Sequence, residues 1–129
     1  MKLVVQSIVT GPFQENTYIV GDQVSSQCVL IDPGDEDQKI VQVLEENNFQ
    51  PIAIINTHAH LDHIGAVAEI KERYMIPFYL HIAEKPVLES YPIATRMFGL
   101  QEKEIPSVDK WIESGGPLKI GPFVFSIIE

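Results

Sequence analysis

The chain has 129 residues, of which 45% are hydrophobic, so it can bury a core and is too apolar for a disordered protein. Its net charge of −9 argues against a nucleic-acid partner, since such proteins usually carry a basic patch. No apolar run is long enough to span a membrane, and residues 1–10 lack the apolar core and cleavage site of a signal peptide. We therefore expect one soluble domain over residues 1–129 with no membrane partner.

Cys28 is the only cysteine, so it forms no disulfide within the chain. It opens the apolar run 28–31, where a buried small hydrophobic side chain is a better interpretation than a reactive thiol. A single unpaired cysteine favours a reducing, cytoplasmic location.

The first third of the chain has the pattern of strands. Residues 3–9 are largely β-branched and apolar, and two further strands are expected at 17–20 and 27–31. Turn residues separate these strands, so we expect an antiparallel meander. The sequence Asp32-Pro33-Gly34 ends the third strand sharply.

The middle of the chain alternates helices and strands. Residues 35–48 and 65–75 have apolar side chains at helical spacing. Residues 51–55 form a continuous apolar run, which predicts an interior strand covered on both faces, and 77–81 form another short strand. This alternation predicts an α/β fold class.

The last third gives weaker patterns. Residues 83–97 are weakly helical and interrupted by two prolines, and 99–116 are expected to be mostly polar loop. Residues 117–120 and 123–128 flank a Gly-Pro turn and predict a hairpin.

Three of the four histidines fall within six residues, as His58, His60 and His63, with Asp62 among them. If the segment is extended, His58, His60 and Asp62 point to one side, and His63 turns away as the next helix begins. Imidazole and carboxylate ligands suit zinc, and also iron or manganese. We therefore interpret the cluster as a metal site at the carboxyl end of a strand, in preference to a solvated loop that happens to contain histidines.

The order H-x-H-x-D-H resembles the metal-binding motif of the metallo-β-lactamase superfamily. The surrounding segments GPFQENTY (11–18), LIDPG (30–34), IINT (54–57) and IGA (64–66) are similar to those of small bacterial glyoxalase II-like (hydroxyacylglutathione hydrolase-like) hydrolases. The resemblance runs over the whole chain, from residue 1 to residue 129.

The resemblance implies specific roles. His58 and His60 would bind the first of one or two zinc ions, and Asp62 and His63 would bind the second. Asp62 would also orient the attacking water, as the catalytic residue. Asp32 would lie behind the metal ligands and support their loop, although a turn before Pro33-Gly34 explains that residue equally well.

The resemblance also implies ligands that this sequence lacks. The family uses a third histidine on the first metal, a bridging aspartate and a last histidine, whereas only His81 follows His63. We expect His81 to be a structural or surface residue. The chain is then the N-terminal part of an αββα sandwich, its first half and the start of its second, apparently truncated at the C-terminus. Weak metal binding and self-association through an uncovered apolar face would follow.

The expected function is a metal-dependent hydrolase that uses a metal-bound hydroxide on a small-molecule substrate, first of all a thioester such as hydroxyacylglutathione. Three alternatives stay open. The chain could be an inactive metal-binding or structural fragment that self-associates. The same loop would also serve a non-haem iron persulfide dioxygenase, or a lactonase or β-lactamase of the same fold.

Overall fold

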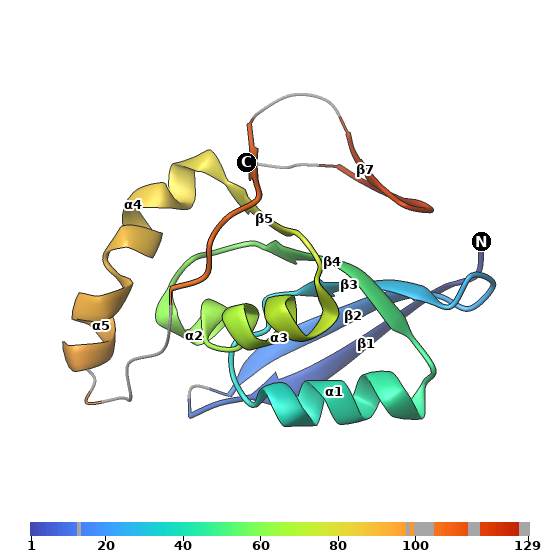
Figure 1. Cartoon of the computed structure of the whole chain (residues 1–129), viewed down its shortest axis with the longest axis horizontal. Helices are drawn as coiled ribbons and strands as arrows, with labels where there is room; N and C mark the ends of the chain where they lie inside the picture. The colour runs from blue at the N-terminus through green and yellow to red at the C-terminus, as the bar shows by residue number, and fades with distance from the viewer. Residues whose placement is uncertain (13, 98, 100–104, 114–116, 127–129) are drawn as a thin grey trace.

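The computed structural model describes residues 1–12, 14–97, 99, 105–113 and 117–126, which form a six-stranded sheet, a two-stranded sheet and several helices (Figure 1). The strands of the large sheet are β1 (Leu3–Thr10), β2 (Glu15–Asp22), β3 (Gln27–Ile31), β4 (Gln50–Asn56), β5 (Phe78–His81) and β6 (Lys110–Ile112). The small sheet pairs β7 (Leu118–Ile120) with β8 (Phe123–Phe125). The helices are α1 (Asp37–Glu46), α2 (Leu61–Ile64), α3 (Val67–Tyr74), the 3-10 turn η1 (Ile82–Glu84), α4 (Lys85–Glu89) and α5 (Tyr91–Met97).

The large sheet has the strand order β1-β2-β3-β4-β5-β6. The first three strands form the expected antiparallel meander, whereas β3, β4, β5 and β6 run parallel to one another. Helix α1 connects β3 to β4, and α2 and α3 connect β4 to β5. The carboxyl ends of these parallel strands therefore lie at one edge of the sheet. The mixed α/β fold class expected from the sequence is confirmed.

One face of the large sheet is covered by α1 and α3. Ile40 and Leu44 of α1 and Ile70 of α3 pack against the sheet in the same buried cluster as Phe78 and Leu80 of β5. The helical spacing of these apolar residues is what turns one side of each helix toward the sheet.

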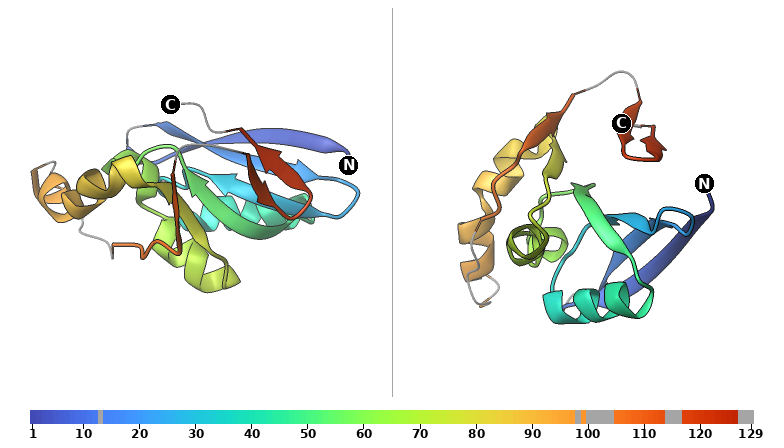
Figure 2. Two further views of the ribbon diagram at one scale, coloured as in Figure 1. Left: turned by 90° about the horizontal axis from the view of Figure 1, so that it is seen from above. Right: turned by 45° about the vertical axis from the view of Figure 1, so that its right-hand side comes forward.

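The opposite face carries a second apolar cluster beneath the hairpin of β7 and β8. Ile120 and Phe123 of the hairpin join Val29, Ile55 and Tyr79 of the sheet. Figures 1 and 2 show the hairpin on the side of the sheet away from α1. Strand β4 thus contributes to both clusters, as its continuous apolar run predicted.

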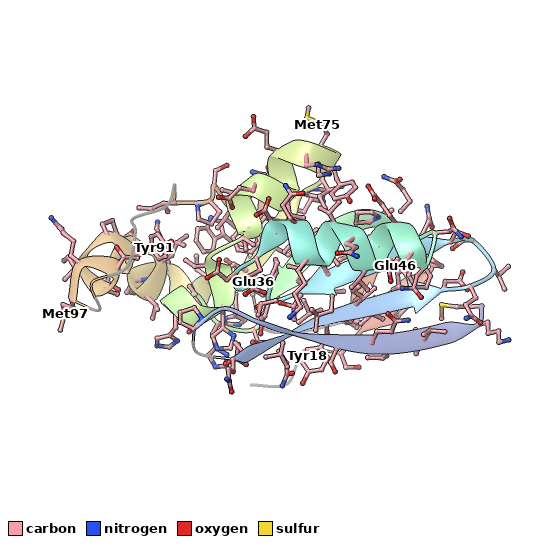
Figure 3. All side chains as sticks on the ribbon, turned by 90° about the horizontal axis from the view of Figure 1, so that it is seen from below. Tyr18, Glu36, Glu46, Met75, Tyr91 and Met97 are labelled. Carbon is pink, nitrogen blue, oxygen red and sulfur yellow. The ribbon has the colours of Figure 1, made fainter. Side chains whose placement is uncertain are left out.

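This second face is uncovered over β1 and β2. Leu3, Val5 and Val9 alternate along β1 and are exposed, and Val5 pairs with Val20 of β2 on the same side. Tyr18 is also exposed, and Figure 3 shows it projecting on the side of the sheet away from α1. The hairpin therefore leaves an apolar row on β1, formed by Leu3, Val5 and Val9, exposed to solvent.

One prediction for the last third needs correction. The expected loop at 99–116 contains β6, which pairs in parallel with β5. Three residues are too few to show a periodicity, and β6 is set by pairing, since Asp109 exchanges hydrogen bonds with the backbone of Phe78. The predicted interruption of residues 83–97 is confirmed, because η1, α4 and α5 are separate short segments, and Pro86 and Pro92 lie in the first turns of α4 and α5, where proline is tolerated. The expected strand 123–128 is observed as β8 over Phe123–Phe125, whereas Ser126 lies outside the strand, and residues 127 and 128 lie outside the described part.

Cys28 is fully buried in the cluster beneath the helices, as expected for a small hydrophobic side chain. Burial raises the pKa of its thiol to about 12, so the reactive thiolate is disfavoured. In the part of the chain that the structure describes, no helix is long and apolar enough to cross a membrane.

The junction between α2 and α3 packs directly against the turn after β3. A Cβ at Gly65 would lie 2.1 Å from the carbonyl oxygen of Gly34, so the two backbones meet where only glycine fits. The Ala66 amide donates to the Pro33 carbonyl at 3.0 Å. This contact fixes the helix that follows the histidines relative to β3.

We expect Gly65→Ala to lower the free energy of unfolding by about 1–3 kcal/mol, because the new methyl group forces these backbones apart. Urea denaturation followed by circular dichroism measures the change. A midpoint equal to that of the unchanged chain would contradict the close packing of Gly65 on Gly34.

We expect the 129-residue chain to self-associate through the apolar row on β1. Light scattering should show a mass above that of a monomer, and the double change of Val5 and Val9 to lysine should shift it toward the monomer. Val24→Lys is the matched control, because Val24 is 74% exposed but lies in the turn between β2 and β3. A monomer at every concentration would rule out self-association.

Candidate metal centre

The histidine cluster follows β4, at the edge where the parallel strands end. Asp32 comes directly after β3, and Glu84 ends the turn η1 that follows β5. Because β3 and β5 are the neighbours of β4 and run in the same direction, these residues approach the loop from both sides. Segments 25 to 31 residues apart in sequence therefore meet around one short loop.

The backbone of this loop differs from the predicted extended segment. His60 is extended at the start of α2, but the helix begins at Leu61. Asp62 and His63 are therefore both helical, so the expected alternation through Asp62 is wrong. Strand β4 ends at Asn56 because the Asn56 side-chain amide donates to the carbonyls of His58, at 3.2 Å, and His63, at 2.7 Å, which folds the loop back. The placement of the Asp62 side chain lies outside what the structure describes.

The three imidazoles gather at this loop. The ring centroid of His58 lies 5.8 Å from that of His60 and 5.1 Å from that of His63. Nitrogen ligands lie about 2 Å from a shared zinc ion, which places their ring centroids roughly 5–6 Å apart. Each of these two ring pairs is therefore spaced as two imidazoles that share a metal ion would be.

Asp32 orients His63 directly and His58 through Thr57. Its carboxylate is buried and accepts hydrogen bonds from the Thr57 amide at 2.7 Å and the Thr57 hydroxyl at 2.5 Å. The same carboxylate lies 3.1 Å from Nδ1 of His63. This contact favours a proton on Nδ1, so that Nε2 of His63 carries the lone pair that a metal needs.

The Thr57 hydroxyl extends this effect to His58. The hydroxyl has one proton, which it donates to Asp32, so it accepts from Nδ1 of His58 at 3.0 Å. Nε2 of His58 is then the nitrogen that carries a lone pair. The structure thus places Asp32 behind the expected ligands. Its side-chain hydrogen bonds run to Thr57 and His63, and not to the local turn alone.

Glu15, at the start of β2, also reaches this site. Its carboxylate oxygen lies 3.7 Å from Nε2 of His63, and its side chain is partly exposed. The carboxylate adds negative charge beside the imidazoles, which favours a bound cation. Glu15 was part of the quoted segment 11–18 but was not singled out from the sequence.

Imidazole nitrogens with nearby carboxylates are a donor set that fits zinc, iron or manganese. The described side chains supply only part of a ligand shell. Among the residues whose side chains the structure describes, no three histidine, cysteine, aspartate or glutamate side chains converge on a single metal position. The donor chemistry fits a divalent metal, and His58, His60 and His63 are the described residues that would hold it.

A cavity of about 490 Å³ adjoins the cluster. Its apolar wall includes Ile55 and Phe125, and its polar side includes His58, His81 and Glu84. His81 accepts the Ala83 amide on its Nδ1 at 3.1 Å and so caps η1. The prediction that His81 has a structural role is consistent with this contact.

Of the residues predicted for the site, the structure brings His58, His60, His63 and Asp32 together at the loop, and the side chain of Asp62 lies outside what it describes. Sequence reasoning missed Asn56 and Glu84, which hold the loop backbone. The position of Asn56, directly after the apolar run 51–55, could have indicated its role from the sequence. Glu84 carried no local signal.

A family model described as the metallo-beta-lactamase superfamily matches residues 10–125. A probable metallo-hydrolase of Bacillus subtilis, YqgX, is 42% identical over 116 residues, which are 88% of this chain and 53% of that protein. The hydroxyacylglutathione hydrolase GloC of Haemophilus influenzae is 29% identical over 126 residues, or 96% of this chain and 59% of that protein. The chain thus spans somewhat more than half the length of these relatives.

Solved structures show the same fold. The B3 metallo-β-lactamase BLEG-1 superposes with a TM-score of 0.86 at 33% identity, over 95% of this chain and 59% of that one. TTHA1623, solved in a di-iron-bound form, has a TM-score of 0.79 at 39% identity, over 88% of this chain and 56% of that one.

We expect Asp32→Asn to weaken metal binding roughly 10–100-fold, since it removes the charge and an acceptor that orient His58 and His63. Asparagine tolerates the positive φ of 54° at this position, so the turn should persist. Competition with a chromophoric chelator measures the affinity, and Asp37→Asn in the first turn of α1 is the control. Equal affinities for the two variants would contradict this role for Asp32.

Proposed function

The chain belongs to the metallo-β-lactamase superfamily, and we propose that its protein is a metal-dependent hydrolase acting on thioesters of the hydroxyacylglutathione type. The family and fold class expected from the sequence are confirmed by the family match and by the superposition on BLEG-1. The observation that carries the proposal is the gathering of His58, His60 and His63 at the edge where the parallel strands end.

The family motif assigns the metal ligands within this loop. His58 and His60 would hold one metal, and Asp62 and His63 would hold the second. A bound metal supplies a water activated at neutral pH and polarises the scissile carbonyl. Asp32 keeps His63 in the tautomer that presents Nε2, and Asn56 holds the loop carbonyls, so the ligands are oriented before a metal arrives.

Relatives support the substrate class. GloC of Haemophilus influenzae and a protein of Bdellovibrio bacteriovorus that is 30% identical to this chain over 118 residues are both named hydroxyacylglutathione hydrolases. We take zinc as the first metal to test, with iron or manganese next, because the di-iron form of TTHA1623 shows that a similar structure holds iron. The single buried Cys28 suits a cytoplasmic location.

A second candidate applies to the 129-residue chain by itself. The described side chains form an incomplete ligand shell, and structural and catalytic zinc sites normally use at least three protein ligands. We therefore propose that this chain alone binds metal weakly and hydrolyses little or no substrate.

We expect His58→Ala in the gene product that contains this chain to reduce hydrolysis of S-lactoylglutathione by more than the roughly 100-fold seen when residues behind the metal ligands are changed. The metal content, measured by atomic absorption, should fall with it. Gln42→Ala on the exposed side of α1 is the control. Retained turnover in His58→Ala would reject the mechanism, and turnover of another ester class alone would reject the substrate.

A further inference from the structure

The turn after β5 reaches back to the metal loop. Oε1 of Glu84, at the end of η1, accepts the backbone amide of Ala59 at 2.9 Å. These residues are 25 apart in sequence, and Ala59 lies between His58 and His60. A hydrogen bond to a carboxylate is stronger than one between neutral groups, so this contact holds the loop at its centre.

Ala59 is the point about which the two histidines are arranged. Its side chain is 1% exposed and packs in the cluster beneath the helices, whereas His58 and His60 on either side are exposed. With the methyl group held inward, both imidazoles must face outward. Fixing the Ala59 amide therefore fixes the directions in which the two rings leave the backbone.

The position of Glu84 is set by the fourth histidine. His81 ends β5, and its Nδ1 accepts the Ala83 amide, which shapes the turn that presents Glu84. Strand β5 is anchored beside β4 by parallel pairing, with Leu80 opposite Asn56. The chain of contacts thus runs from His81 through η1 and Glu84 to the loop.

We propose that Glu84 is a positioning residue for the metal ligands His58 and His60, and that His81 supports it by capping η1. The loop is then held from both neighbouring strands, by Asp32 after β3 at Thr57 and by Glu84 after β5 at Ala59. The proposal rests on the proposed metal site, because positioning has a purpose only if the two histidines bind a metal together.

The first readout needs no metal. Amide hydrogen exchange at Ala59, followed by NMR in the metal-free chain, should speed up at least roughly tenfold in Glu84→Ala, which loses a charge-assisted hydrogen bond. Glu84→Gln keeps an acceptor oxygen and should retain most of the protection. Glu89→Ala, an exposed position on α4, is the matched control and should leave the exchange unchanged. Equal exchange at Ala59 in Glu84→Ala and the unchanged chain would overturn the proposal.

The second readout is cobalt(II) binding, because the absorption spectrum of the bound ion reports its coordination geometry. Glu84→Ala should weaken binding and alter the spectrum, and Glu84→Gln should restore both. Likewise His81→Asn, which keeps a capping acceptor, should bind better than His81→Ala. A spectrum and affinity unchanged in Glu84→Ala would overturn positioning.

The two proposals can fail separately. If the unchanged protein binds no cobalt, zinc or iron, the proposed function fails, and amide exchange alone then decides whether Glu84 holds the loop. If the protein binds metal but Glu84→Ala behaves like Glu89→Ala in both readouts, the proposed function stands and the role of Glu84 is rejected.

Discussion

The parallel pairing of β3, β4 and β5 is the constraint on which the site depends. Because α1 and the pair α2 and α3 return the chain across one face, these three strands run in the same direction and end at one edge. Asp32, the histidine loop and Glu84 each follow a different strand and so come together without any local sequence relation. Had one of these strands run the other way, its following residue would lie at the far edge.

The irregular loop after β4 needs hydrogen-bond partners that a sheet or helix would otherwise supply. Polar side chains provide them: buried Asp32 accepts the Thr57 amide, buried Asn56 donates to two carbonyls, and half-buried Glu84 accepts the Ala59 amide. Because these side chains hydrogen-bond the loop backbone, the imidazoles do not have to do so and can face outward. Asp32 has a second effect, since it favours a proton on Nδ1 of His63 by direct contact and on Nδ1 of His58 through the Thr57 hydroxyl.

Most of the fold followed from periodicity. The apolar alternation placed the first three strands, and helical spacing placed α1 and α3, because both patterns are written within a few neighbouring residues. Strand β6 was not predicted, because its three residues take their conformation from pairing with β5. The two apolar faces also differ in a way that no local pattern shows: helices cover one, whereas the hairpin leaves the row on β1 exposed.

The sequence by itself determined the family, and it predicted the donor types and the four histidine and aspartate positions of the loop, because residue type and spacing are local properties. The tertiary structure alone decided that Asp32 contacts Thr57 and His63 and that Glu84 holds the Ala59 amide. These contacts join residues 25 to 31 apart. They exist only because parallel strands bring their carboxyl ends to the same edge of the sheet. No local pattern in the sequence predicts these contacts.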